Sequence, residues 1–341
     1  MNSIETVSVD LGKNTFHAIA YDDRGRELHR KLLSRTAVIK YFANLEPCVV
    51  AMEACGGSHF LAREIARFGH TPKLMAAQHV RPYVKSNKTD FGDAGAIYSA
   101  SQNSDMRFVA PKTEAQQALA TLNVVREAFV KDRSATVNRI HGLLLEMGVA
   151  LTPSFKSIRT LPVLLDDCTF SPLVKAVLME LHGHFNYLSG KLDQLNKELE
   201  RQVAGDDLAT RLMTIPFIGP ITSSALAAEL GDGKQFKCGR DYSASIGLVP
   251  RQFSTGGQTK LLGISKRGDR NQRRLLVLCS RAYLIHLDRQ KGALADWVRD
   301  LLTRHHSNHV VCALANKLGR IAWAIAANHT EFDAGPAAMN A

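Results

Sequence analysis

The sequence predicts an α/β domain with a mixed β-sheet at the N-terminus, followed by a region made mostly of helices. Two observations carry this prediction. The first 75 or so residues alternate short β-rich segments with helical ones, and residues from about 114 to 203 show the spacing of long helices. With 341 residues and a hydrophobic fraction of 45%, the chain is long enough for two or three domains with buried cores.

The N-terminal segments follow a regular order. A meander comes first, with strands at Thr6–Asp10, Thr15–Tyr21 and Glu27–Leu33 and a hairpin turn that contains Asp22 and Asp23. Helices and buried strands then alternate: Ala37–Leu45, Cys48–Glu53, Ser58–Phe68 with Ser58 as N-cap, and Thr71–Met75. A meander followed by helix, strand, helix and strand is the order of a ribonuclease H-like or RuvC-like fold. We expect this domain to cover residues 1–112.

Two long helices are predicted next, over Glu114–Met147 and up to about Val203. Apolar residues on the second helix alternate spacings of four and three, which is a heptad pattern: Leu181, Phe185, Leu188, Leu192, Leu195 and Leu199. A helical hairpin within one chain and a coiled coil between chains both produce this pattern. We expect residues 113–208 to form a helical, coiled-coil spacer that serves oligomerisation.

A mostly helical C-terminal domain is expected over residues 209–330. Apolar helical stretches flank a turn at Pro216–Pro220, and Ser245–Thr259 has the Gly, Ser and Thr content of a loop. An arginine-bearing helix at Asn271–Leu287 and an apolar helix at Val310–Ala327 follow. Residues 331–341 are rich in Ala and Gly and are predicted to be a disordered tail.

The charge distribution points to a polyanionic partner. The formal net charge is +11, and the segment Arg251–Arg304 holds twelve Lys or Arg against four Asp. Such a local cationic surface fits a nucleic acid or an anionic membrane. No apolar run approaches the roughly 20 residues that span a bilayer, and the N-terminus lacks a signal-peptide pattern. The six cysteines are scattered, which is typical of reduced thiols in a cytosolic protein.

Four acidic residues are candidates for one metal site. Asp10 ends the first strand, Glu53 ends the fourth, and Asp90 and Asp93 stand three apart at the expected start of a helix. The first and fourth strands are neighbours in the expected fold, so the carboxylates would converge. Hard cations such as Mg²⁺ (or Mn²⁺) relieve this repulsion, and a pair of them can clamp both reacting oxygens of a phosphodiester. Taken singly, each acid has an ordinary role in a turn or at a helix N-terminus.

The segment Gly247–Gly268 is the second candidate. Ser254 and Thr255 precede two glycines, which would let the backbone approach a phosphate closely. A hydroxyl in such a setting acts as a nucleophile if a base or a metal ion activates it. The plain alternative is an ordinary turn in a solvated basic loop. We expect these basic residues to contact nucleic acid: Lys88, Arg251, Lys260, Lys266, Arg267, Arg270, Arg273 and Arg274.

In combination these segments resemble the transposases of the IS110/IS1111 family, and the IS1111 branch most closely. The resemblance rests on VDLGKNTFH at Val9–His17, AMEACGGSHF at Ala51–Phe60, KTDFGDA at Lys88–Ala94, IPFIGPIT at Ile215–Thr222, and GLVPRQFSTGGQTKLLGISKRGDRNQRRLL at Gly247–Leu276. It implies an N-terminal RuvC-like DEDD domain, whose four acids fall on Asp10, Glu53, Asp90 and Asp93. It also implies an IS116/IS110/IS902-type C-terminal domain with a catalytic serine, which we assign to Ser254, with Thr255 as the alternative. Phe217 stands where the family commonly has Gly.

The resemblance further implies the reaction. A serine attacks a DNA phosphate, forms a covalent link, and is released after strand exchange, with the acidic metal site stabilising the charge. The expected partners are DNA (the element's ends or junction, and the target), a non-coding RNA from the element, and further copies of the chain as a dimer or tetramer, with no membrane. Such a protein would be cytoplasmic and associated with the nucleoid.

Three other functions compete with this one. A RuvC-like, structure-specific endonuclease would use the same acids with water as the nucleophile. A sugar-kinase or actin-like ATPase also opens with a strand, an Asp and a Gly, but residues 95–205 lack the further Gly-rich phosphate loops. A non-catalytic nucleic-acid binding protein would need only the basic segment.

Overall fold

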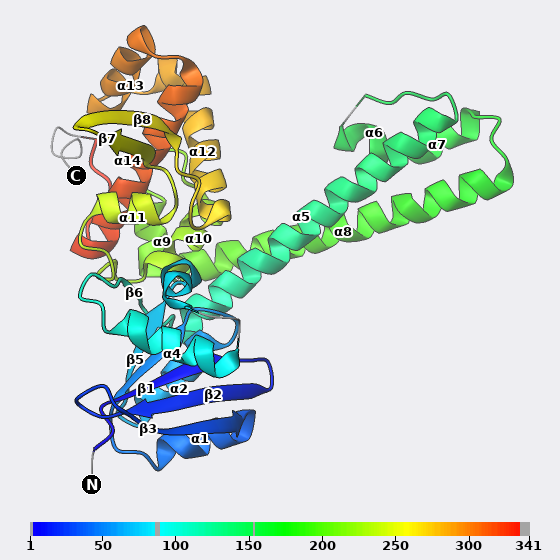
Figure 1. Cartoon of the computed structure of the whole chain (residues 1–341). Helices are drawn as coiled ribbons and strands as arrows, with labels where there is room; N and C mark the ends of the chain where they lie inside the picture. The colour runs from blue at the N-terminus through cyan, green and yellow to red at the C-terminus, as the bar shows by residue number, and fades with distance from the viewer. Residues whose placement is uncertain (1–2, 86–88, 153, 335–341) are drawn as a thin grey trace. The chain divides into compact units, whose positions relative to one another are not determined.

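The computed structural model describes residues 3–85, 89–152 and 154–334, in two compact units of residues 1–114 and 115–341 (Figure 1). The first unit contains a mixed sheet in the order β3-β2-β1-β4-β5-β6. Its strands are β1 (Thr6–Leu11), β2 (Thr15–Tyr21), β3 (Glu27–Ser34), β4 (Val49–Glu53), β5 (Thr71–Met75) and β6 (Phe108–Val109). The strands β1, β2 and β3 are antiparallel neighbours, whereas β4 is parallel to both β1 and β5. This sheet is consistent with the expected RuvC-like domain.

Helices cover both faces of this sheet. They are α1 (Arg35–Ala43), α2 (Ser58–Arg67), α3 (Ala77–Val80), the short 3₁₀ helix η1 (Arg81–Tyr83) and α4 (Asp90–Ser101). Because side chains alternate along a strand, Met52 packs on the face of α1 and α2, whereas Ala51 packs on the face of α4 beside Ala96. The N-cap of α2 is Gly57, which corrects the assignment of Ser58; the Ser58 hydroxyl instead donates to the Cys55 carbonyl at 2.8 Å.

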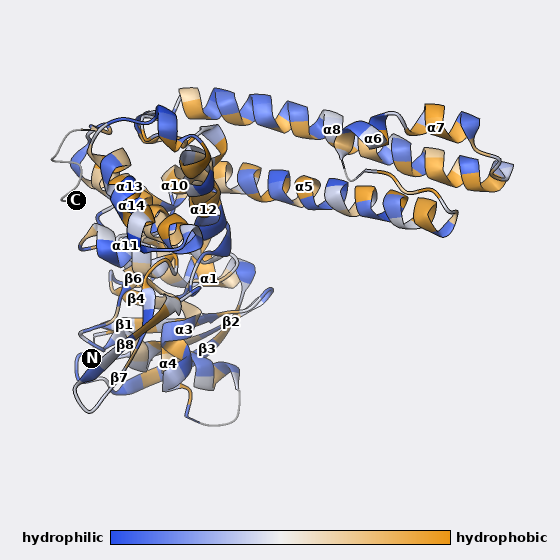
Figure 2. Ribbon diagram, turned by 90° about the horizontal axis from the view of Figure 1, so that it is seen from above, coloured by the Kyte–Doolittle hydropathy of each residue, from blue (hydrophilic) through white to orange (hydrophobic). Residues whose placement is uncertain are grey.

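The second unit begins with a helical hairpin. Its long helices are α5 (Glu114–Glu146) and α8 (Pro172–Ala204), joined through α6 (Phe155–Arg159) and α7 (Leu161–Asp167). Figure 2 shows α5 and α8 side by side, with apolar and polar residues alternating along each. Phe185 of the heptad pattern is buried in one cluster with Val137 and Ile140 of α5. Within one chain, therefore, the heptad face packs as a helical hairpin.

The rest of the second unit is mostly helical. It contains α9 (Asp207–Leu212), α10 (Pro220–Leu230), α11 (Gly239–Ser245), α12 (Arg270–Ile285), the 3₁₀ helix η2 (Leu287–Arg289), α13 (Ala293–Arg304) and α14 (Ser307–Asn328). The helix α14 is long and apolar enough to cross a membrane by composition, but 61% of its most apolar stretch is buried. Leu314 and Leu318 of α14 lie at the centre of the largest apolar cluster, so this is a core helix. The six cysteines are all free.

A second local prediction was also wrong. The segment expected to be a loop around Ser254 is a β-hairpin, β7 (Pro250–Thr255) and β8 (Gln258–Ile264). Its two-residue turn has Gly256 at φ +54° and Gly257 at φ +78°. A hairpin turn with positive φ at both central residues matches the twist of the flanking strands, and glycine adopts it without strain.

Candidate functional site

Two of the candidate acids stand side by side at the carboxyl ends of β1 and β4. These strands are parallel neighbours, and Val9 pairs with Met52. Asp10 and Glu53 each follow by one residue, so they end the two strands at the same edge of the sheet. Strand alternation turns both side chains toward the face that α4 covers, and both are partly buried.

The other two acids occupy the first turn of α4. The helix starts at Asp90 because Thr89 caps it, with the threonine hydroxyl accepting a hydrogen bond from the Gly92 N–H at 3.1 Å. Asp90 and Asp93 are three residues apart and therefore share a face of the helix. The partial positive charge of a helix N-terminus favours carboxylates at these positions. Asp90 is exposed and Asp93 is partly buried.

The structure brings all four acids to one pocket. Its lining consists of Asp10, Leu11, Glu53, Ala77, Val80, Arg81, Val84, Asp90, Asp93 and Ile97. Burial raises the pKa of the nearby Cys55 thiol, and the negative charges of Glu53 and Asp10 raise it further. Lys88, predicted to contact nucleic acid, lies outside the described residues.

A histidine that the sequence reasoning missed lies at the same place. His17 on β2 pairs in register with Asp10 on β1, and its Nε2 is 3.5 Å from Asp90 Oδ2. One potential ligand atom each from Asp10, His17 and Asp90 lie within 4.8 Å of one another. Glu53 and Asp93 line the pocket without joining this group of three in the described part of the chain. The β1–β2 hairpin register was the available signal, because it places the strand partner of Asp10 seven residues later.

The donor atoms suit a divalent cation. Carboxylate oxygens are the preferred ligands of Mg²⁺, and Mn²⁺ accepts carboxylate together with imidazole. A metal ion bound to these residues would polarise a phosphodiester and neutralise the charge that develops on its oxygens. The acids come from three separate segments of the chain, so the fold itself assembles the set.

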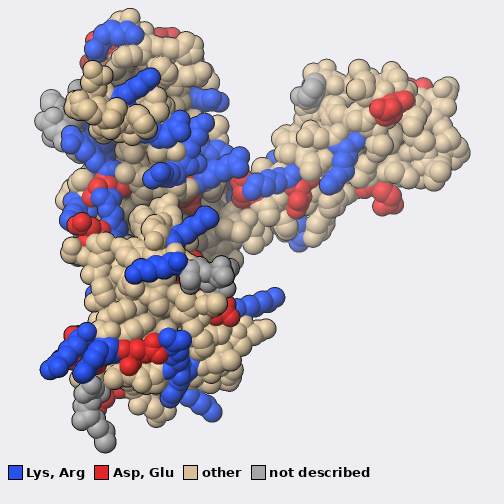
Figure 3. Space-filling model, in the orientation of Figure 1, with Lys and Arg blue, Asp and Glu red and all other residues tan. Residues whose placement is uncertain are grey.

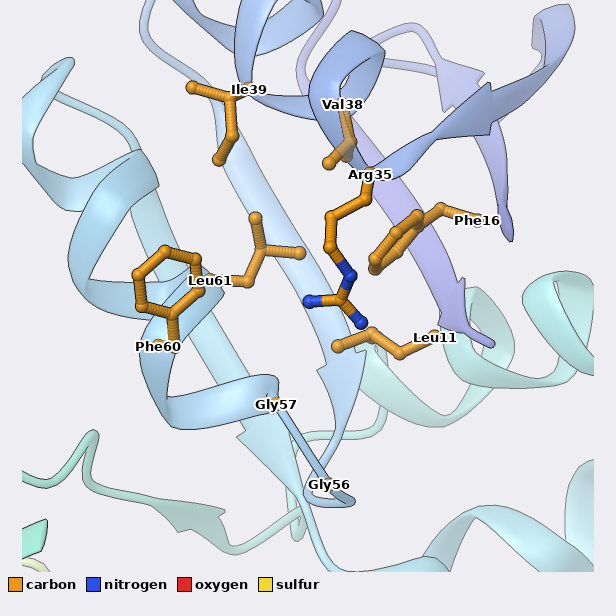
Figure 4. Close-up of a pocket in the computed structure, with 9 residues that line it drawn as sticks. All are labelled: Leu11, Phe16, Arg35, Val38, Ile39, Gly56, Gly57, Phe60 and Leu61. Atoms are coloured by element: carbon orange, nitrogen blue, oxygen red, sulfur yellow. The ribbon is translucent and has the colours of Figure 1, made fainter. Parts of the chain in front are cut away.

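The opposite face of the sheet has a smaller hollow at the same end of β1. Figure 4 shows the Arg35 side chain running between Phe16, Leu11 and Leu61 toward the Gly56–Gly57 loop. The Arg35 Nη2 donates to the Lys13 carbonyl at 2.6 Å, and the guanidinium lies 5.5 Å from the ring centre of Phe16. This hollow is therefore lined by apolar side chains and by an arginine that is already bonded to the protein.

The candidate nucleophiles lie on the β7–β8 hairpin, and both are exposed. Neighbouring residues of a strand point to opposite faces, so Ser254 and Thr255 project in opposite directions. Ser254 pairs with Thr259 and shares its face with Gln252, whose amide Nε2 donates to Ser254 Oγ at 2.7 Å. Thr255 shares the other face with Phe253 and its cross-strand partner Lys260.

The hairpin is fixed at its base by a close backbone contact between the segments 245–249 and 265–268. The Ser265 N–H donates to the Val249 carbonyl at 2.8 Å, and the Lys266 N–H donates to the Gly247 carbonyl at 3.1 Å. A Cβ added at Gly268 would lie 1.6 Å from the Ser245 carbonyl oxygen, so only glycine fits there.

The basic residues near the hairpin divide into two groups. The first group is exposed and consists of Arg251, Lys260, Lys266, Arg267 and Arg270. The second group is bonded to the protein itself: Arg273, which is half-buried, donates from Nη1 to the carbonyls of Ile246 at 2.8 Å and Arg267 at 2.9 Å, and Arg274, although exposed, forms an ion pair with Glu127 at 2.7 Å. Figure 3 shows Lys and Arg gathered on the face of the second unit that carries α12. The exposed group fits a polyanion, while Arg273 supports the base of the hairpin.

Comparisons with known proteins match both parts of the chain. Residues 7–148 match a family model described as a transposase, of the DEDD type of IS110, and residues 209–294 match one described as the transposase IS116/IS110/IS902 family. The chain is 48% identical over 332 residues to the transposase for insertion sequence element IS1328 of Yersinia enterocolitica, covering 97% of this chain and 99% of that protein. It is 35% identical to the transposase for IS1111A of Coxiella burnetii, covering 98% and 93%.

Proposed function

The chain belongs to the IS116/IS110/IS902 family of transposases, enzymes of insertion sequences that cut and transfer DNA, and we propose that it does so with Ser254 as the nucleophile. Asp10, Glu53, Asp90 and Asp93 would hold the divalent metal ion, Mg²⁺ or Mn²⁺, that assists the reaction. The convergence of these acids on one pocket is the observation that supports this proposal most strongly.

In the proposed reaction, Ser254 Oγ attacks a DNA phosphorus atom. A serine–phosphorus ester bond forms, the bond from phosphorus to one sugar oxygen breaks, and the serine proton is taken up by that leaving oxygen. Attack by a sugar hydroxyl of the other strand reverses these changes and frees the serine. The metal ion, when bound, stabilises the negative charge on the phosphate oxygens. The acidic residues hold it, and the exposed cations of the hairpin region position the DNA backbone.

Strand geometry separates Ser254 from Thr255. The amide that Gln252 directs at Ser254 Oγ occupies one lone pair of this oxygen. The hydroxyl hydrogen remains available for transfer to a base or to the leaving oxygen. Thr255 faces the opposite side of the hairpin, so one docked phosphate meets one of the two hydroxyls.

The wider assignment follows from the family and the fold. We assign residues 1–112 to the metal-binding catalytic domain, 113–208 to a helical spacer that serves oligomerisation, and 209–330 to the serine-bearing domain, with 331–341 as a tail. The working form would be a dimer or tetramer in the cytoplasm, at the nucleoid. It would act on the element's junction and target DNA, guided by an RNA from the element.

A covalent adduct tests the nucleophile. Purified protein would be incubated with junction DNA, candidate RNA and Mg²⁺ or Mn²⁺, and the protein–DNA adduct would be trapped under denaturing conditions. We expect wild type and Thr255→Ala to form the adduct, and Ser254→Ala and Asp10→Asn to lose it. If Thr255→Ala loses the adduct and Ser254→Ala retains it, the nucleophile is Thr255 and the assignment of Ser254 is wrong.

The second candidate function is a RuvC-like endonuclease that uses water, favoured by the same acidic pocket. It predicts metal-dependent DNA cleavage with no adduct in wild type and full cleavage by Ser254→Ala. Asp10→Asn abolishes activity under both functions, so the serine variant decides between them.

A further inference from the structure

We propose that His17 Nε2 is a direct ligand of the metal ion, which makes this a mixed nitrogen and oxygen site. The proposal rests on the proposed function, because it concerns the metal ion of the same pocket. One donor atom each from Asp10, His17 and Asp90 lie within 4.8 Å of one another. Ligands on opposite sides of an ion with bonds of about 2.1 Å are about 4.2 Å apart, so a small contraction completes the set.

The position of the imidazole is fixed by the fold. The β1–β2 register holds His17 opposite Asp10, and the side chain is only 13% exposed. The imidazole and the Phe91 ring pack in a T-shaped arrangement with 4.8 Å between ring centres. Phe91 immediately follows Asp90 at the start of α4, so the helix that delivers the carboxylate also orients the histidine.

The distance to Asp90 favours metal ligation over a simple hydrogen bond. His17 Nε2 and Asp90 Oδ2 are 3.5 Å apart, longer than the 2.7–3.2 Å of a good N–H···O bond. Two donors at this separation both reach an ion that lies between them. An imidazole ligand raises affinity for Mn²⁺ more than for Mg²⁺, because Mg²⁺ prefers oxygen ligands and retains its waters. The site should therefore favour Mn²⁺ more than an all-carboxylate site would.

Pulsed electron paramagnetic resonance on the full chain loaded with Mn²⁺ tests the proposal without any activity measurement. Wild type should show the ¹⁴N modulation of a directly bound imidazole, and His17→Gln should lose it. The Mn²⁺ Kd should rise by about tenfold or more in His17→Gln, since even partners outside the ligand shell change affinity 10- to 100-fold. The Mg²⁺ Kd, measured by competition, should change by less than about threefold. His29→Gln is the matched control, because His29 lies on β3 of the same sheet with its Nε2 3.1 Å from the Tyr41 hydroxyl.

The outcomes separate the two proposals. Mn²⁺ binding that is lost in Asp10→Asn but shows no ¹⁴N modulation in wild type overturns the role of His17 and leaves the acidic metal site standing. Modulation that persists in His17→Gln, or disappears in His29→Gln, also overturns it. Failure of wild type to bind Mn²⁺ overturns the metal site itself.

Discussion

Substitutions of Arg273 and Arg270, which lie one turn apart on α12, should distinguish a residue that supports the structure from one that contacts DNA. Both were candidates for nucleic-acid binding from the sequence. In the structure, Arg273 is half-buried and bonded to the carbonyls that flank the hairpin base. Arg270 is exposed, and its guanidinium forms no hydrogen bond or ion pair among the described residues. We expect Arg273→Gln to lower stability and Arg270→Gln to lower DNA affinity.

The magnitude follows from the contacts. Arg273 makes two bonds of 2.8 and 2.9 Å, and a third to the Asp269 carbonyl at the weak distance of 3.5 Å. Each hydrogen bond to a charged group contributes about 1.5–3 kcal/mol to stability. Solvent weakens the bond to the exposed Arg267 carbonyl, so we expect the loss of both short bonds in Arg273→Gln to lower the free energy of unfolding by about 3 kcal/mol. Arg270→Gln should cost less than about 0.5 kcal/mol. Loss of the Arg270 charge should reduce the slope of log K for DNA binding against log salt concentration by about 0.9 for each phosphate contact that is lost.

Urea unfolding followed by tryptophan fluorescence measures the first effect. Trp297 and Trp323 are the tryptophans of the chain, and both lie in the second unit, so the signal reports that unit alone. With a denaturant slope of about 1–3 kcal/mol per molar, the midpoint of Arg273→Gln should fall by about 1 M or more. An unchanged midpoint together with a reduced salt slope would show that Arg273 is a DNA contact and that the structural argument is mistaken.

Three further predictions concern local features. Burial, then nearby cations, lower the pKa of His59 to about 4. Stability present above pH 6.5 should therefore be lost as the pH falls toward 4, by up to about 3 kcal/mol, and an NMR titration of His59 near 6.5 would contradict this. Gly268→Ala should destabilise the second unit by at least about 2 kcal/mol because its Cβ meets the Ser245 carbonyl, while Gly263→Ala, with open space around it, should change little. Phe217 has φ +65°, so in urea unfolding Phe217→Gly should be more stable than Phe217→Ala by about 1 kcal/mol, and the reverse order would refute this backbone strain.

Five of the six strands of the first unit could be predicted to within about a residue, whereas the short edge strand β6 (Phe108–Val109) was not predicted. Strand patterns at Thr15–Tyr21 and Thr71–Met75 have the same bounds in the structure, because buried strands carry a strong local signal. The site acids followed, since their positions depend only on strand ends and on the helix cap at Thr89. Strand ends and helix caps are local features of the sequence. The expected order of the strands then indicated that Asp10 and Glu53 lie at one edge of the sheet.

The remaining features depend on contacts between distant segments. The segment around Ser254 was interpreted as a loop because of its Gly, Ser and Thr content. In the hairpin that it forms, the residues on both faces are exposed, so no alternation of polar and apolar residues marks the strands. The role of Arg273 depends on carbonyls six and 27 residues away in the chain. His17 carries no ligand spacing in the sequence and becomes a candidate only when β1 and β2 pair.

The hairpin that carries Ser254, the proposed nucleophile, is anchored at its base. Its base is held by backbone bonds and by Arg273, whereas both strands are exposed along their length, including Phe253 and Leu261. An isolated two-stranded hairpin is marginally stable in water, so the direction of the Ser254 hydroxyl depends on what docks against it. On the Ser254 face the cross-strand partner is Thr259, while Lys260 lies on the other face, so this face brings little positive charge to a phosphate. Under the proposed mechanism, cations bound to DNA or the metal ion balance the charge of the phosphate, and the serine becomes reactive only when DNA and the acidic pocket are both assembled around it.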